Sequence, residues 1–288
     1  MAVLAPSSLA EVLTHLREHP DALVLSGGTD VMVEINMAHR SAPADVVALR
    51  RVDELRRWRH DPDTGDGGGT VTIGAALPFA AMERAPLRDQ FPALAEAART
   101  VGSPQIRAAG TLGGNLGTAS PAGDGLPVLY ALDAVVHLRS TGGERAVAIG
   151  EFITGVKQNV LAPGELITGV TLPVQRGWQG FAKVGVRNAM VIANASACLA
   201  VDRDRGTAGL ALGAVGPTVI RCRTAEDWLT GQTDLTAEQP LITDTLAREF
   251  GRRAAAEARP IDDHRSTAAY RAHAVGVLSS RLLRRAAG

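Results

Sequence analysis

Two stretches rich in glycine and small polar residues have the composition of a phosphate-binding backbone. Residues 110–124 contain four glycines within their first eight positions, followed by Ser120 and Asp124. Residues 26–30 read Ser-Gly-Gly-Thr-Asp and have the same character. Glycines let a backbone turn tightly and present bare N–H groups to an anion. The pair predicts a diphosphate bound from two sides, and the alternative for each stretch is a plain glycine-rich surface loop.

The elements predicted around these stretches would hold them in position. Residues 22–25 read as a short buried strand that runs directly into Ser26, and residues 31–37 read as a helix that starts at the loop. In that order, strand, loop and helix direct backbone N–H groups and the positive helix end at a phosphate. Residues 46–49 form a second predicted strand, which completes a small β-α-β unit. A helix over residues 91–101 then delivers the chain to the second stretch.

Several familiar cofactor and metal sites are excluded by the sequence. It contains no G-x-G-x-x-G, which argues against a Rossmann dinucleotide site. Its two lysines, Lys157 and Lys183, do not follow a glycine, so a G-x-x-x-x-G-K phosphate loop is absent. Its two cysteines, Cys198 and Cys222, are far apart, which excludes an iron–sulfur cluster or a thiolate zinc site built by this chain alone.

A predicted amphipathic helix that begins after Ser8 and is stopped by Pro20 carries a zinc-like pattern. The segment from His15 to His19 reads His-Leu-Arg-Glu-His and matches the H-x-x-E-H motif. However, His19 abuts Pro20 at a fraying helix end, and the apolar stripe occupies the neighbouring face. Because such short patterns arise by accident, no metal ligand is predicted here.

Composition and charge bound the class of protein. With 288 residues, 45% apolar and 21% charged, the chain has the composition of a globular protein and room for two domains. Its 30 basic and 30 acidic side chains cancel, which gives no electrostatic case for binding nucleic acid or an anionic membrane. No apolar run reaches the ~18–20 residues of a membrane span, and the N-terminus lacks a signal-peptide layout. A cytoplasmic protein without a membrane span is therefore expected.

The order of the remaining elements favours an α+β fold in two domains. Strands and helices interleave in the first part of the chain without a regular β-α repeat. Residues 61–69 are rich in turn formers and predict a hairpin connector before a strand over residues 70–74. From Trp178 onward, three predicted strands are followed by two or three helices. The expected domains are residues 1–176 and 177–288.

Together the motifs resemble those of a known flavoprotein family. The chain is similar to the FAD-binding medium subunits of the xanthine dehydrogenase and carbon monoxide dehydrogenase family, which are molybdenum hydroxylases. The resemblance covers essentially the whole chain, in the family's order and spacing. The matching segments are residues 26–30, 105–115, 119–124, 164–167, 181–187 and 262–271.

The resemblance implies a fold and a cofactor. The first domain would be a FAD-binding domain of the PCMH, vanillyl-alcohol-oxidase-like type, with subdomains at about residues 1–58 and 59–176. The second would be a small α+β domain with a three-stranded antiparallel sheet plus helices. Lys183 would lie near the flavin ring, where a cation favours a reduced, anionic flavin. The implied cofactor contacts are Leu25, Ser26, Gly27, Gly28, Thr29, Asp30, Val101, Thr111, Gly114, Asn115, Ser120, Asp124, Leu166, Ile167 and Lys183.

The resemblance also implies partners and a route for electrons. A large molybdopterin-binding subunit would hydroxylate the substrate, and a small subunit with two [2Fe-2S] clusters would pass electrons to FAD in this chain. An external acceptor, which is NAD, oxygen or a quinone, would then receive them, with no residue of this chain acting as acid, base or nucleophile. The complex would be a dimer of heterotrimers, and its substrate stays open among purines, carbon monoxide, N-heterocycles and aldehydes.

Alternatives to this interpretation remain open. One is a stand-alone FAD oxidase of the vanillyl-alcohol-oxidase type, although such enzymes need a larger substrate domain than the chain after Gly177 provides. Another is a non-catalytic assembly subunit that no longer holds flavin. Lys183 has the alternative reading of a surface charge, and Asp124 that of a helix N-cap. Residues 188–191, Asn-Ala-Met-Val, depart from the acidic residues of many relatives, so the flavin surroundings or a subunit contact are expected to differ there.

Overall fold

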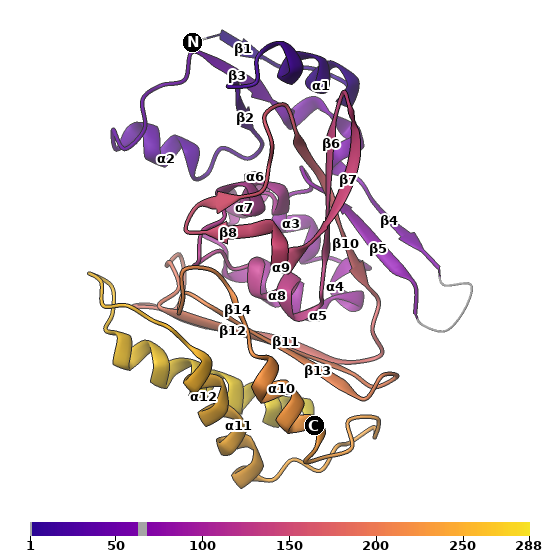
Figure 1. Cartoon of the computed structure of the whole chain (residues 1–288), viewed down its shortest axis with the longest axis vertical. Coiled ribbons are helices and arrows are strands. Elements are labelled where there is room, and N and C mark those ends of the chain that lie inside the picture. The colour runs from indigo at the N-terminus through magenta and orange to yellow at the C-terminus, as the bar shows by residue number, and fades with distance from the viewer. Residues whose placement is uncertain (1, 63–67) are drawn as a thin grey trace.

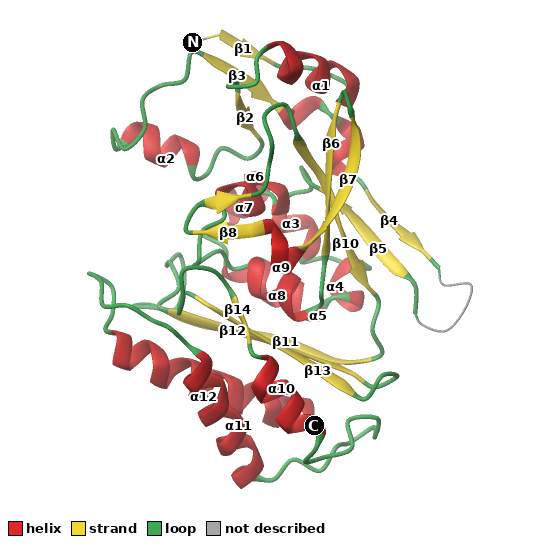
Figure 2. Cartoon of the chain, viewed as in Figure 1, coloured by secondary structure: helices red, strands yellow, loops and turns green. Residues whose placement is uncertain are grey.

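Three larger β-sheets succeed one another along the long axis of the molecule, with helices between and outside them (Figure 1). The computed structural model describes residues 2–62 and 68–288. Helices and strands are mixed throughout, so the predicted α+β class is confirmed (Figure 2). Over the described residues, no helix is long and apolar enough to cross a membrane.

A small parallel sheet forms the N-terminal end of the molecule. Its elements are, in chain order, β1 (Ala2–Leu4), α1 (Leu9–Glu18), β2 (Leu23–Leu25), α2 (Val31–Asn36) and β3 (Asp45–Ala48). The strands pair in the order β1-β3-β2, so the predicted β-α-β unit is confirmed and β1 is an additional strand. Val12, Leu13 and Leu16 of α1 are buried in one cluster with Val47 of β3, which holds the helix on the sheet.

An antiparallel sheet of five strands forms the middle of the molecule. Two 3-10 turns, η1 (Leu49–Arg51) and η2 (Asp53–Arg56), lead to its strands β4 (Trp58–Asp61), β5 (Thr70–Gly74), β6 (Val135–Ser140), β7 (Gly143–Ala148) and β10 (Leu166–Pro173). They pair in the order β4-β5-β10-β6-β7. Strand β4, which was not predicted, is antiparallel to β5, as a hairpin requires. Of the connector predicted over residues 61–69, residues 63–67 lie outside the described residues.

Short helices and a two-stranded ribbon accompany the middle sheet. They are α3 (Phe79–Met82), α4 (Leu87–Gln90), α5 (Pro92–Thr100), α6 (Pro104–Ala109), α7 (Leu112–Thr118), α8 (Leu126–Ala131) and α9 (Ile149–Phe152), with ribbon strands β8 (Ile153–Gly155) and β9 (Gln158–Asn159). Helix α5 confirms the helix expected over residues 91–101. Helix α7 corrects the expectation of an open glycine loop at residues 110–124, because it occupies the centre of that stretch. The side chain of Thr111 begins it by accepting a hydrogen bond of 3.0 Å from the N–H of Gly114.

The C-terminal part is an antiparallel sheet with helices on its outer face (Figure 2). Its elements are β11 (Gly177–Val184), β12 (Ala195–Asp202), β13 (Thr207–Gly213), β14 (Ile220–Arg221), α10 (Arg223–Thr230), α11 (Asp244–Glu257) and α12 (Ala268–Ala286). Three strands were expected, and the sheet has a fourth. Strand β14 pairs with β13 over only two residues, which is too short to produce a period in the sequence.

The inner face of the C-terminal sheet packs on the preceding part of the chain. Phe181 of β11 is buried in the same cluster as Leu94 of α5 and Leu129 of α8. On the outer face, Leu199 of β12 belongs to a separate cluster with Phe250 of α11. The sheet is therefore a layer shared by two cores, and β11 is positioned to bring side chains to the boundary between them.

Candidate functional site

The first glycine stretch forms a loop whose backbone N–H groups are available to a ligand. It leaves β2 at Ser26 and enters α2 after Asp30, as predicted. Gly28 has a φ of 71°, a left-handed conformation that glycine adopts at low cost. Among the residues that the structure describes, the N–H groups of Gly27, Gly28 and Thr29 have no hydrogen-bond acceptor. Successive free N–H groups of this kind form a concave site for an anion.

The second stretch lies directly against this loop. A Cβ placed on Gly27 would lie 2.2 Å from the carbonyl oxygen of Ala109, so only glycine permits this approach. The hydroxyl oxygens of Ser26 and Thr111 are 2.8 Å apart and share a hydrogen bond. The two stretches, which are far apart in the sequence, are therefore adjacent in the fold.

The glycines of the second stretch serve close packing rather than anion binding. The N–H of Gly113 donates to the carbonyl oxygen of Ala75 at 2.9 Å, and the N–H of Gly110 caps α6 with a bond of 2.6 Å. A Cβ placed on Gly113 would come within 2.6 Å of Ala75. The N–H of Gly114 is bound to the Thr111 side chain. The expectation of bare N–H groups here is wrong for these three glycines, because α7 and its contact with Ala75 use them.

A cavity of about 270 Å³ opens where the two stretches meet. Its lining includes Ser26, Gly27, Ala76, Pro78, Ala108, Ala109 and Thr111. Arg50 and Arg56, from the turns after β3, complete the wall. Guanidinium groups suit phosphate because their N–H groups form forked pairs of charge-assisted hydrogen bonds. The sequence analysis missed both arginines, since nothing in their local sequence distinguishes them from other arginines.

A second polar cluster surrounds Asp124 at the boundary with the C-terminal sheet. The Lys183 ammonium, on β11, donates to Asp124 Oδ2 at 2.6 Å and to the carbonyl oxygen of Thr100 at 3.1 Å. The Thr100 hydroxyl donates to the same carboxylate oxygen at 3.2 Å. The side chains of Lys183 and Asp124 are each only 7% exposed. Neither alternative reading holds, because Lys183 is not a surface charge and the N-cap of α8 is Gly125.

The environment of Asp124 changes its protonation. Burial raises the pKa of Asp124 to about 6, and the charge and hydrogen bond of Lys183, with the hydrogen bond of Thr100, offset that effect only in part. At neutral pH the carboxylate therefore balances the ammonium group of Lys183. Lys183 presents an uncompensated cation only where Asp124 is protonated, below about pH 6.

Buried oxygen atoms around this cluster lack partners. Within residues 2–62 and 68–288, Oδ1 of Asp124, Oδ1 of Asn115 and Oδ1 of Asn194 are buried and accept no hydrogen bond. A buried unpaired acceptor costs about 1–3 kcal/mol, so these atoms indicate donors supplied from outside the chain. Asn194, whose N–H donates to the carbonyl oxygen of Val184 at 2.9 Å, was not selected from the sequence. Its position beside β11 depends on the pairing of β11 with β12.

Helix α7 links the two polar clusters. Thr111 stands at its start, and Asn115 follows four residues later on the same face, about 6 Å along the axis. The free N–H groups and arginines near Thr111 suit a diphosphate. The unpaired acceptors of Asn115 and Asp124 suit hydroxyl groups, which donate hydrogen bonds, as those of the ribityl chain do. The residues present therefore fit FAD.

The other residues predicted to contact the cofactor differ in how far they are exposed. Val101 ends α5 and is half-buried, and the Ser120 hydroxyl accepts an N–H two residues on at 3.3 Å. Leu166 is 3% exposed and packs in the cluster of α1, whereas Ile167 is 7% exposed and packs in the cluster of the middle sheet. Asp30 is exposed at the start of α2. Their contact with FAD stays a prediction.

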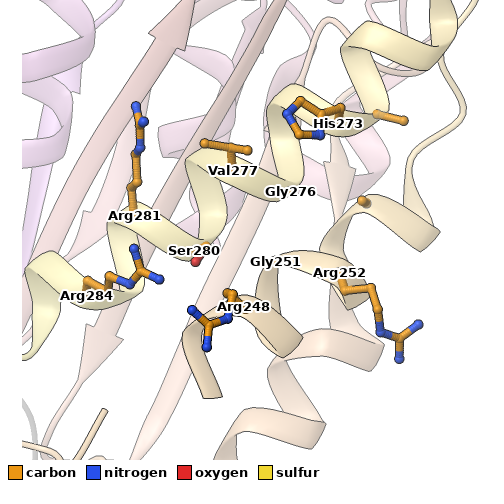
Figure 3. Close-up of a pocket in the computed structure, with 11 residues that line it drawn as sticks. Arg248, Gly251, Arg252, His273, Gly276, Val277, Ser280, Arg281 and Arg284 are labelled. Atoms are coloured by element: carbon orange, nitrogen blue, oxygen red, sulfur yellow. The ribbon is translucent and has the colours of Figure 1, made fainter. Parts of the chain in front are cut away.

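A larger cavity of about 470 Å³ lies between α11 and α12, on the outer side of the C-terminal sheet (Figure 3). Arg248 and Arg284 lie beside each other along it, and Arg252 points away. The helices cross closely, since a Cβ placed on Gly251 would lie 2.2 Å from the carbonyl oxygen of Gly276. No residue predicted to contact the cofactor lines this cavity, so it is separate from the candidate site.

Comparison with known proteins agrees with this architecture over the whole chain. Residues 1–175 match the family described as FAD binding domain in molybdopterin dehydrogenase, and residues 181–286 match the CO dehydrogenase flavoprotein C-terminal domain. The nicotinate dehydrogenase FAD-subunit of Eubacterium barkeri is 32% identical over 258 residues, which cover 84% of this chain and 85% of that protein. The carbon monoxide dehydrogenase medium chain of Afipia carboxidovorans is 29% identical over 289 residues, which cover 98% and 94%. A solved structure of reconstituted CO dehydrogenase from Oligotropha carboxidovorans superposes with a TM-score of 0.87 at 27% identity, over 99% of this chain and 97% of that one.

Fold, site and comparisons define the class of protein as a FAD-carrying oxidoreductase subunit. The chain belongs to the family of FAD-binding subunits of molybdopterin dehydrogenases. The resemblance drawn from the motifs and the expected FAD cofactor are thereby confirmed.

Proposed function

We propose that this chain carries FAD as the point at which electrons leave a multi-subunit molybdenum hydroxylase. The observation that carries the proposal is that the free N–H groups of residues 27–29 and two arginines lie near the start of α7, while unpaired buried acceptors lie farther along it and beyond its end. The names of two relatives, a FAD-subunit and a medium chain, support it, because such names describe one part of a larger assembly. The chain would not act on the substrate by itself, since no acid, base or nucleophile is required of it.

In this proposal the diphosphate binds at the junction of the two glycine stretches. The N–H groups of residues 27–29 donate to its oxygens, and the hydrogen-bonded pair of Ser26 and Thr111 hydroxyls adds one further donor. Arg50 and Arg56 balance its negative charge. Leu25 and Asp30 frame the loop at its two ends, and Gly114 lies in the first turn of α7.

The flavin end lies toward β11. FAD supplies the redox chemistry, because it exchanges electrons singly or in pairs. Asn115, Ser120 and Asp124 hold the polar chain between diphosphate and ring. The apolar contacts predicted for the cofactor are Val101, Leu166 and Ile167. Lys183 sets the local charge through its pairing with Asp124.

The partners follow from the same proposal. A large subunit with molybdopterin acts on the substrate, and a small subunit with two [2Fe-2S] clusters passes electrons to this chain. NAD, oxygen or a quinone receives them, and the complex is a dimer of heterotrimers. A cytoplasmic location is part of the same proposal.

The domain division is part of the proposal. Residues 1–176 form the FAD-binding domain, with subdomains divided near residues 58 and 59, and residues 177–288 form the C-terminal domain. The change from the parallel sheet of β1, β2 and β3 to the antiparallel sheet that starts at Trp58 supports the inner boundary. The start of β11 at Gly177 supports the outer one.

Purification of the chain with its natural partners tests the assembly. We expect flavin absorption in the purified sample, together with a large molybdopterin protein and a small protein with eight cysteines, four for each cluster. If flavin bands are missing even after incubation with FAD, the cofactor assignment fails. Turnover of an organic substrate by the isolated chain would instead establish the stand-alone oxidase, and FAD without any partner would remove the proposed complex.

The variant Gly27→Ala tests the diphosphate site in the isolated chain. Its Cβ would collide with the Ala109 carbonyl and separate the two stretches, so FAD retention should be lost. Gly150→Ala is the matched control, because a Cβ there meets no atom within 4 Å. The measurement is the flavin-to-protein absorbance ratio after gel filtration. Equal ratios for the two variants would contradict the proposed site.

A further inference from the structure

Three metal-ligating side chains meet at the N-terminal end of the molecule, outside the FAD site. His15 lies in the last turns of α1, His19 caps that helix, and Asp45 begins β3. The carboxylate of Asp45 approaches His15 Nε2 at 2.7 Å and His19 Nδ1 at 3.9 Å. One ligand atom from each of the three residues lies within 4.8 Å of the others.

The pattern noticed in the sequence and the cluster in the fold share the histidines but not the carboxylate. Glu18, the acidic residue of the H-x-x-E-H match, is exposed and pairs with Arg17 at 3.2 Å. Asp45, from the neighbouring strand, provides the third ligand. The motif was set aside on the sequence because His19 abuts Pro20 at a helix end and such short patterns arise by accident. Local sequence also cannot show a ligand that the fold brings from another element.

The distances from the Asp45 carboxylate to the two histidine nitrogens are close to those between the ligand atoms of a bound metal ion. Tetrahedral zinc with bonds of about 2.0–2.2 Å separates its ligand atoms by roughly 3.3 Å. The separation between His15 and Asp45 would need to open slightly, and His19 would need to approach by a similar amount. The His19 side chain is 55% exposed and free to adjust, whereas that of His15 is only 17% exposed. The two imidazole rings stack with centroids 4.5 Å apart, so the exposed His19 ring would also have to turn for both nitrogens to point at one ion.

The scaffold around the cluster is firm. The helix that carries His15 is anchored by its buried residues Val12, Leu13 and Leu16. Asp45 is held in β3 by parallel pairing with Ala2 of β1. Two ligands are therefore fixed by the fold, which lowers the cost of ordering them on binding.

We propose that His15, His19 and Asp45 form a binding site for a divalent transition-metal ion such as Zn²⁺. Imidazole nitrogens and one carboxylate suit Zn²⁺, Ni²⁺ and Cu²⁺ better than Mg²⁺ or Ca²⁺, which prefer oxygen ligands. Three protein ligands leave one position for water. The ion would fasten the end of α1 to the start of β3, in the same sheet as the strand that leads into the loop of residues 26–30. The site is independent of the proposed function of FAD.

A calorimetric titration of the untagged full-length chain with Zn²⁺ tests this site. We expect one ion per chain and no binding of Mg²⁺ or Ca²⁺ under the same conditions. His19→Ala and Asp45→Asn should each weaken Zn²⁺ binding more than about tenfold, since even loss of an outer-shell partner costs that much. The matched control is His264→Ala, an exposed histidine outside the cluster, which should bind as the wild-type chain does.

Two further readouts separate metal binding from a purely structural ion pair. Co²⁺ in place of Zn²⁺ should give the visible d–d absorption of a four-coordinate site, and this absorption should be missing from His19→Ala. Saturating Zn²⁺ should raise the thermal midpoint of the wild-type chain but not that of His19→Ala. His15→Ala is less suitable alone, because it also removes the bond of 2.7 Å to Asp45. If the wild-type chain binds no Zn²⁺, the cluster is only an ion pair and the proposal is overturned. The proposal is also overturned if His19→Ala and Asp45→Asn bind Zn²⁺ as tightly as the wild-type chain does.

Discussion

One buried pair controls the charge beside the expected flavin position. Lys183 comes from β11 and Asp124 from the turn before α8, so the pair also joins the two domains. Because burial raises the pKa of Asp124 to about 6, the carboxylate balances Lys183 at neutral pH. Protonation of Asp124 at lower pH would leave the cation alone near the cofactor, where Coulomb attraction favours an anionic reduced flavin. The pH at which this change occurs is open to measurement on the protein itself.

The variant Asp124→Asn is expected to change the pH dependence of stability in a definite direction. The pKa of Asp124 rises from 3.8 to about 6 on folding, so the folded state binds the proton more tightly. Between these values the free energy of unfolding contributed by this residue falls as the pH rises, by at most about 3 kcal/mol. The asparagine does not titrate. The wild-type chain should therefore lose stability relative to the variant from about pH 4 to about pH 6 and keep a constant difference above that range.

Urea unfolding of both proteins over this pH range measures the difference. The comparison with the variant is necessary because other carboxylates act in the opposite direction. Although burial alone would raise it, the pKa of Asp263 is lowered to about 2 by hydrogen bonds from Arg265, Arg271 and Ser266. Stability curves that run parallel from acid to neutral pH would show that Asp124 is not perturbed in this way.

Arg50 and Arg56 are expected to strengthen FAD binding by attraction to the diphosphate. Both are exposed at the cavity wall, and exposed ion pairs contribute only about 0.2–1 kcal/mol. Each change to alanine should therefore weaken FAD binding by at most about fivefold, and added salt should reduce the effect. Fluorescence titration of the FAD-free chain measures this. Arg139→Ala, an exposed arginine on β6, is the control, and an equal loss in that variant would refute a specific role.

Residue types were easier to predict than the partners of each residue. Ser26, Thr111 and Asn115 could be chosen as candidates because small polar residues beside glycines suit anion and hydroxyl binding. Arg50 and Asn194 could not, because their roles depend on where the turns after β3 and the start of β12 lie in space. The carboxylate that meets His15 was invisible for the same reason.

Helix α7 shows at the level of elements why a glycine-rich sequence need not be an open loop. Glycine is a poor helix former by about 1 kcal/mol per residue relative to alanine, which favoured the loop interpretation. The hydroxyl of Thr111 offsets part of this cost by capping the helix, and the absence of a side chain at Gly113 lets the helix pack on Ala75. Propensity was overruled by a tertiary contact that lies beyond the local sequence.

Gly113→Ala and Gly114→Ala should separate packing from cofactor binding within one helix. A Cβ on Gly113 would lie 2.6 Å from the backbone oxygen and the Cβ of Ala75, so overpacking should cost about 1–3 kcal/mol of stability. A Cβ on Gly114 meets only the Thr111 hydroxyl, at 3.1 Å, so the fold should persist while FAD retention falls if the cofactor approaches there. Thermal unfolding and the flavin-to-protein ratio measure the two effects. If the Gly114→Ala variant retains all its FAD, the prediction that Gly114 contacts the cofactor is wrong.

Several strands that escaped prediction are defined by pairing rather than by their own pattern. Strands β1, β4 and β14 span three, four and two residues and lie at sheet edges. Such short runs carry no readable period, and their extended conformation depends on a partner strand. The elements with a clear pattern of their own, among them α1, α5 and β5, were predicted close to their observed bounds.

The C-terminal sheet connects the two hydrophobic cores, so we expect the whole molecule to unfold as a single unit. Its inner face shares a core with α5 and α8, and its outer face shares another with the C-terminal helices. Glu96 of α5 strengthens this connection, because it accepts the N–H of Phe181 at 2.7 Å and pairs with Arg285 of α12 at 2.5 Å. Phe181 and Lys183 are two residues apart on β11, and their side chains therefore project from the same face of the strand. Displacement of Phe181 would therefore displace Lys183 from the proposed FAD site as well.

Glu96→Ala is therefore expected to affect both stability and FAD retention from a position outside the site. Loss of one charge-assisted hydrogen bond across the boundary costs about 1–3 kcal/mol, and each kcal/mol lowers the midpoint of a chain near this size by about 2–4 °C. Calorimetry should show one unfolding transition for both proteins, at a lower temperature in the variant, because neither core persists when the shared sheet unfolds. Glu151→Ala, an exposed glutamate on α9, is the control and should leave midpoint and FAD content unchanged. Two resolved transitions in the wild-type chain would mean that the domains unfold independently, and the coupling of β11 to the FAD site through Glu96 would then be abandoned.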